Sequence, residues 1–113
     1  MPIFIKFAPG ATNAPHHPTR EWVAKINAMH LFDDGDNKLR EAIFESHKKP
    51  GVIAGGAKLT PWPNEVFKPR DQLSAEEWKL FIQQVEVFAA YSACSDHEIG
   101  RVIPGFRGCR QAR

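Results

Sequence analysis

The sequence predicts an α-rich α+β domain, on three observations. A short β-branched and aromatic run opens the chain at residues 3–7. Two segments of helical hydrophobic spacing follow, and a third segment keeps that spacing over the longest stretch of the chain. Because the chain has only 113 residues, one core is expected, over residues 1–103, followed by a basic, flexible tail over residues 104–113.

Composition and charge narrow the class of protein. Hydrophobic residues make up 42% and charged residues 25% of the chain, which is typical of a folded protein rather than a disordered one. No apolar run reaches the roughly 18–20 residues of a membrane span, and the first residues lack a signal-peptide pattern. We therefore expect a cytoplasmic protein with no membrane partner. The net charge of +2 is too small to indicate a nucleic-acid partner.

The first residues, Ile3 to Phe7, are predicted to form a strand buried on both faces. Residues 8–18 then form a turn-rich loop with several prolines and two adjacent histidines, His16 and His17. No second strand is evident in the chain, and an unpaired apolar strand is an association hazard. The strand is therefore predicted to pair between copies, which makes a homo-oligomer.

Two shorter helices are expected after this loop. Thr19 can cap the first, which places Trp22 and Ile26 on one face. The acidic run at residues 33–36 breaks that helix, and Asp34 or Asp36 can cap the second. The second helix ends at Pro50-Gly51, and its expected inward side consists of Leu39, Ala42, Ile43 and Ser46.

A proline-rich connection over residues 51–69 leads to the dominant C-terminal helix. Ser74 and Glu77 have the spacing of a capping box at its start. Apolar residues cover most of its circumference, and Lys79, Gln83 and Glu86 mark a narrow polar side. Such a helix is expected at the centre of a core, and Pro104 is expected to end it.

Several segments together resemble part of a sulfatase of the bacterial arylsulfatase type, in the alkaline-phosphatase-like superfamily. Residues 4–18 read FIKFAPGATNAPHHP and are similar to the family's core strand with its A-P-H-x-P loop. Residues 34–45, 51–53 and 59–61 are similar to the region after that loop. Residues 96–101 match the D-x-x-x-G-R pattern of a long family helix. The resemblance covers about residues 3–103.

The resemblance implies one site residue, His16, as the imidazole that contacts the sulfate group. It also implies sulfuric ester hydrolysis with calcium and a formylglycine nucleophile. The C-x-P-x-R motif that supplies this nucleophile and the family's calcium-binding aspartates have no counterpart here. We therefore expect a truncated sulfatase-like protein that uses no cofactor and is not a competent enzyme alone. It would act as an oligomeric scaffold or as a remnant that binds a sulfated molecule or another anion.

The C-terminal tail offers an alternative function. After Ile103 the sequence departs from the family pattern, as a replaced or frameshifted end would. Residues 99–113 contain four arginines and no acidic residue, whereas residues 1–98 have a net charge of −2. These arginines could bind a protein partner or a polyanion, although a solvated terminus is the favoured interpretation.

Three further patterns have competing interpretations. Cys94, His97 and Cys109 could supply three zinc ligands, but a structural zinc site needs four, so His16 or His17 would have to complete it. A buried cysteine and a surface histidine on the same helix are the favoured interpretation. Residues 109–113 keep the Cys and Arg spacing of the formylglycine motif, with Gln111 in place of its proline. Trp62, between two prolines, could be a ligand platform or could pack against the long helix.

Overall fold

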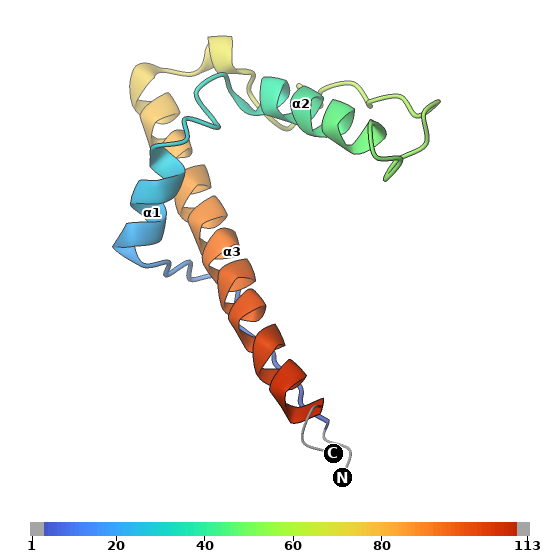
Figure 1. Cartoon of the computed structure of the whole chain (residues 1–113). Coiled ribbons are helices and arrows are strands. Elements are labelled where there is room, and N and C mark those ends of the chain that lie inside the picture. Colours follow the sequence, from blue (N-terminus) through green and yellow to red (C-terminus); the bar gives the residue numbers. More distant parts are fainter. Residues whose placement is uncertain (1–3, 111–113) are drawn as a thin grey trace. The chain divides into compact units, whose positions relative to one another are not determined.

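The computed structural model describes residues 4–110, and of residues 106–110 it describes the backbone only. This part of the chain contains three α-helices and one short 3-10 helix, and no strand (Figure 1). The helices are α1 (Arg20–Asn27), α2 (Asp36–Lys48) and α3 (Ala75–Arg110), and the 3-10 helix η1 (Arg70–Gln72) precedes α3.

The predicted α+β class is wrong, because the described chain is all-helical. Phe4, Ile5 and Phe7 have no strand geometry, and their exposed fractions are 93%, 58% and 51%. Ile3, the first residue of the predicted strand, lies outside the described residues. A strand is stable only beside another strand that pairs with its N–H and C=O groups. Because residues 4–7 do not form a strand, the predicted pairing of this strand between subunits is overturned as well.

The chain divides into two compact units. The terminal unit consists of Met1–Ala28 and Glu86–Arg113, and the middle unit consists of Met29–Val85. Helix α3 contributes residues to both units. In the described part of the chain, no helix is long and apolar enough to cross a membrane.

In the terminal unit, α1 packs on α3 (Figure 1). Thr19 is the N-cap of α1, as predicted, and its side-chain oxygen accepts a hydrogen bond from the Trp22 N–H at 3.4 Å. Among the described residues of this unit, the buried apolar ones are Ile26 of α1 and Ala90 of α3. Lys25 lies 2.8 Å from the Glu21 carboxylate and holds the pKa of that carboxyl below its ordinary value.

In the middle unit, a glycine rather than an aspartate caps α2. Gly35 is the N-cap residue, with φ 89° and ψ 163°, and no side chain caps the helix. The predicted capping by Asp34 or Asp36 is therefore wrong, and Asp36 instead forms the first residue of the helix. The backbone geometry explains the difference, because this region of φ and ψ is open essentially to glycine alone.

Gly35→Ala is expected to destabilise the middle unit by about 1–3 kcal/mol, because the new residue must adopt that strained backbone conformation. Steric conflict is not the cause. An added Cβ would meet the side chains of Arg70 and Trp78 at 3.5 Å, an ordinary contact distance. Urea unfolding measures the effect. Gly55→Ala is the control, because its Cβ would have no neighbour within 4 Å, and an equal loss in both variants would contradict the explanation.

Helix α3 begins as predicted but continues beyond its predicted end. The Glu77 N–H donates to Ser74 Oγ at 3.1 Å, and the Ser74 N–H donates to the Glu77 carboxylate at 2.9 Å. This backbone hydrogen bond, followed by the Lys68 ammonium, holds the pKa of Glu77 below its ordinary value. Pro104 was expected to end the helix, yet helical backbone continues through it to Arg110. Proline removes one backbone donor, and here the residues after it still keep helical geometry.

The predicted position of α3 at the centre of a core is not observed. Leu80, Phe81 and Ile103 keep exposed fractions of 51%, 45% and 51%. Glu86, expected on the polar side, is instead buried, with an exposed fraction of 5%. The exposed apolar side chains of α3 therefore gain little of the stabilisation that burial would give. The expected inward side of α2 is likewise not a core, since α2 has no buried residue.

Candidate anion site at His16

The loop before α1 contains His16, the residue predicted to contact a sulfate group. His16 is half-buried, and its ring meets the Phe88 ring edge-on at a centroid distance of 5.2 Å. The Tyr91 ring lies 6.0 Å away on the next turn of α3. The Tyr91 hydroxyl also lies 3.6 Å from the position that a Cβ on Gly10 would occupy. These contacts hold the loop on α3 and fix the location of the imidazole.

One ring nitrogen of His16 is already engaged. His16 Nε2 lies 3.2 Å from the Thr12 carbonyl oxygen, and because a carbonyl only accepts, Nε2 is the donor. This assigns the proton to Nε2 and leaves Nδ1 as the free nitrogen. A neutral imidazole would then offer a lone pair at Nδ1, which repels an anion. Only the protonated ring donates at both nitrogens, so an anion contact at His16 requires the imidazolium.

The neighbourhood of His16 suits binding better than catalysis. Its ring neighbours are the aromatic side chains of Phe88 and Tyr91, and its ring hydrogen bond goes to backbone. A general base must instead lie within hydrogen-bond reach of a nucleophile. The adjacent His17 is exposed, and no hydrogen bond joins it to His16 in the described chain.

The possible zinc ligands are not brought together in the described part of the chain. The His97 ring packs against Trp22 of α1 at a centroid distance of 5.3 Å. Cys94 is a half-buried free thiol, and the side chain of Cys109 lies outside the description. Among the described residues, no three His, Cys, Asp or Glu side chains form a group that could hold a metal ion.

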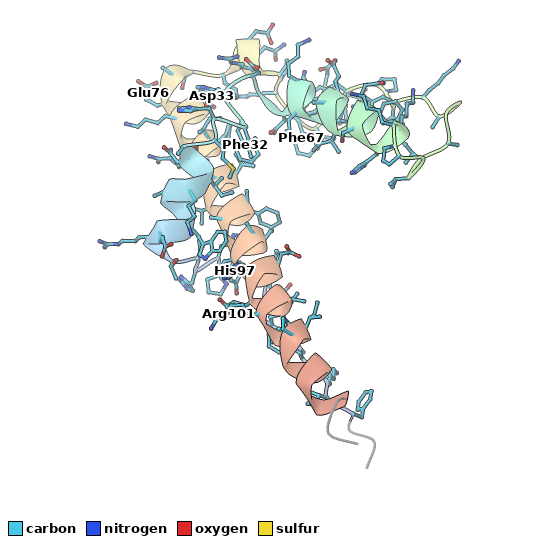
Figure 2. All side chains as sticks on the ribbon, viewed as in Figure 1. Phe32, Asp33, Phe67, Glu76, His97 and Arg101 are labelled. Atoms are coloured by element: carbon cyan, nitrogen blue, oxygen red, sulfur yellow. The ribbon has the colours of Figure 1, made fainter. Side chains whose placement is uncertain are left out.

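The arginine-rich tail is described only in part. Arg101 projects from α3, as does His97 (Figure 2). Its guanidinium donates to both carboxylate oxygens of Glu98, at 3.2 and 2.9 Å, so this arginine is already paired. The side chains of Arg107 and Arg110, and all of residues 111–113, lie outside the description. The side chains of the formylglycine-like pattern at residues 109–113 likewise lie outside the description. Polyanion binding by the tail stays a prediction.

Trp62 packs against a neighbour in its own loop. Its ring lies 6.1 Å from the Phe67 ring, and its indole N–H donates to the Phe67 carbonyl at 3.3 Å. The half-buried tryptophan therefore forms part of the local packing of the proline-rich connection. Packing against Phe67 differs from both predictions for Trp62, which were a ligand platform and packing against the long helix.

Two features of possible chemical interest were not predicted from the sequence. The buried Glu86 carboxylate accepts a hydrogen bond from the Asn27 side-chain amide at 3.1 Å. A surface hollow of about 530 Å³ lies at the start of α2 in the middle unit. Its lining carries both signs of charge, namely Asp34, Asp71, Lys38 and Arg70, together with Gly35, Asn37, Pro69 and Leu73. Neither feature involves His16.

Comparison with known proteins supports relatedness to sulfatases. No family model matches the chain. An uncharacterized sulfatase of Schizosaccharomyces pombe is 30% identical to it over 93 residues, which is 80% of this chain. The chain spans only 16% of the length of that protein. No solved structure matches. The chain is thus sulfatase-like in sequence over most of its length, and it corresponds to a small part of one such protein.

Proposed function

We propose that this chain is a sulfatase-type segment that contacts a sulfate group through His16 and does not hydrolyse sulfate esters by itself. The observation that carries the proposal is the placement of His16. Its loop is anchored on α3 by two aromatic rings, and its Nε2 is held by a backbone carbonyl. The similarity to an uncharacterized sulfatase supports sulfate as the anion.

The chemistry at His16 favours binding without turnover. A protonated imidazole can donate its Nδ1 proton to a sulfate oxygen while Nε2 keeps its bond to Thr12. Hydrolysis needs more, because an activated nucleophile must attack the sulfur and positive groups must stabilise the developing charge. One histidine supplies neither. The chain is expected to contribute a binding contact within a larger catalytic assembly.

The residues present do not fit the cofactors that the resemblance implies. Calcium prefers six to eight oxygen ligands, and no group of three acidic, His or Cys side chains gathers among the described residues. The C-x-P-x-R motif that yields formylglycine is absent, because Gln111 follows Arg110 where the motif has its proline. No step of the proposed function involves either group.

A chromogenic aryl sulfate tests the catalytic half of this proposal. We expect the purified chain, with added calcium, to show no hydrolysis above that of His16→Ala. Hydrolysis by the unmodified chain that His16→Ala abolishes would contradict the proposal, because it would require a complete active site. His17→Ala serves as the matched control, since this neighbouring histidine is exposed and does not contact α3 aromatic rings in the described structure.

A further inference from the structure

Thr60 is an exposed residue in the proline-rich connection of the middle unit. Residues 57–63 have no regular secondary structure, and Pro61 disfavours helical backbone at Thr60. An enzyme that modifies a hydroxyl group can reach it most easily on such an exposed, extended stretch of chain. In residues 46–64 the other hydroxyl group belongs to Ser46, and it already donates to a backbone carbonyl within α2 at 2.8 Å. Thr60 is therefore the accessible hydroxyl of this segment.

The guanidinium of Arg40 lies against the Thr60 hydroxyl. Arg40 is half-buried on α2, and it donates a hydrogen bond to Thr60 Oγ1. Because an arginine side chain carries donors only, Oγ1 is the acceptor and its own proton stays available. Among the described residues, no carboxylate lies within ion-pair distance of Arg40. A positive charge without a carboxylate partner is thus already placed at the side-chain oxygen of Thr60.

The sequence around Thr60 adds positive charge and no negative charge. Residues 46–64 contain Lys48, Lys49 and Lys58 and no acidic residue, although the whole chain has 13 acidic residues. A negatively charged group on Thr60 would therefore meet no carboxylate from its own segment. Opposite an arginine, such a group gains charge-assisted hydrogen bonds that order a loop, whereas beside acidic residues it would be repelled. The segment thus favours a negatively charged substituent on this oxygen.

We propose that Thr60 is a phosphorylation site and that Arg40 binds the phosphate. A protein kinase supplies the phosphoryl group from a nucleoside triphosphate. The Thr60 oxygen attacks the γ-phosphorus, the bond from that phosphorus to the β-phosphate oxygen breaks, and nucleoside diphosphate leaves. The hydroxyl proton passes to a base of the kinase. The planar guanidinium of Arg40 then donates two parallel hydrogen bonds to phosphate oxygens, which ties the proline-rich connection to α2.

Phosphoryl transfer to the folded chain tests the site. Of the serines and threonines in this sequence, only Thr60 precedes a proline, so a proline-directed Ser/Thr protein kinase with ATP is a selective probe. Peptide mass spectrometry is expected to find one phosphoryl group per chain, on Thr60, and none on the Thr60→Val variant. A folded chain that takes up no phosphate at Thr60 would overturn the proposal.

The titration of the phosphate tests the role of Arg40. By phosphorus NMR, the second ionisation of the phosphate is expected at a lower pH in the phosphorylated chain than in phosphorylated Arg40→Gln, because the guanidinium favours the dianion. Lys38→Gln is the matched control, since it removes one positive charge from the same helix, from a side chain that pairs with Glu41. This control is expected to keep the titration of the unmodified sequence. Equal titration midpoints with and without Arg40 would contradict the phosphate contact. None of these outcomes depends on whether His16 binds sulfate.

Discussion

Replacing Phe32 with alanine is expected to lower the free energy of unfolding of the middle unit by about 3–5 kcal/mol, the usual cost of removing a buried phenylalanine ring. Phe32 has an exposed fraction of 7% and is the buried large side chain of this unit among the described residues. A small unit has little stability in reserve, so a loss of this size should remove its ordered structure at room temperature.

Hydrogen exchange of the α2 amides measures this effect, because these amides belong to the middle unit. Phe67→Ala is the matched control, since Phe67 is 56% exposed and contacts Trp62 at the surface. It should change stability by about 0.5 kcal/mol or less. If protection of α2 were equal in the two variants, Phe32 could not be the residue that holds this unit together.

Replacing Asn27 with alanine is expected to destabilise the terminal unit by about 1–3 kcal/mol at neutral pH, because it leaves a buried acceptor without a partner. Glu86 is 5% exposed, and the Asn27 amide donates to its carboxylate at 3.1 Å. Burial of a carboxylate is tolerated only where such a hydrogen bond compensates for the lost water.

A double-mutant cycle with Glu86→Gln isolates this interaction. Glutamine keeps an oxygen that can accept from Asn27 but carries no charge, so the loss of Asn27 should cost less in that background. Hydrogen exchange of the α1 amides reports on the stability of the terminal unit, which contains that helix. If Asn27→Ala lowered the free energy of unfolding equally in both backgrounds, the hydrogen bond from Asn27 would not be what stabilises the buried charge of Glu86.

The helix starts were predictable where their cause is local. The Thr19 cap and the Ser74–Glu77 capping box depend on residues three positions apart, and the structure contains both. The cap of α2 was missed because Asp34 and Asp36 are common capping residues. The chain uses the positive φ of Gly35 there instead.

Features that depend on distant residues were not predictable from the sequence. The residues at 4–7 have strong strand propensity, but a strand forms only beside a partner, and the described chain provides none. Glu86 looked like a surface residue because its burial depends on the docking of α1. His16 was proposed from a motif, whereas its packing against Phe88 and Tyr91 depends on how the loop folds back onto α3.

Titration with sodium sulfate at a pH of about 6, followed by NMR of the His16 ring, is the most direct measurement of the proposed sulfate contact. The His16 signals should shift saturably with a dissociation constant weaker than about 1 mM, since one charged hydrogen bond gives little free energy. Sodium chloride at equal ionic strength is the control. If sulfate moved the His16 signals no more than chloride did, the proposed contact would be wrong.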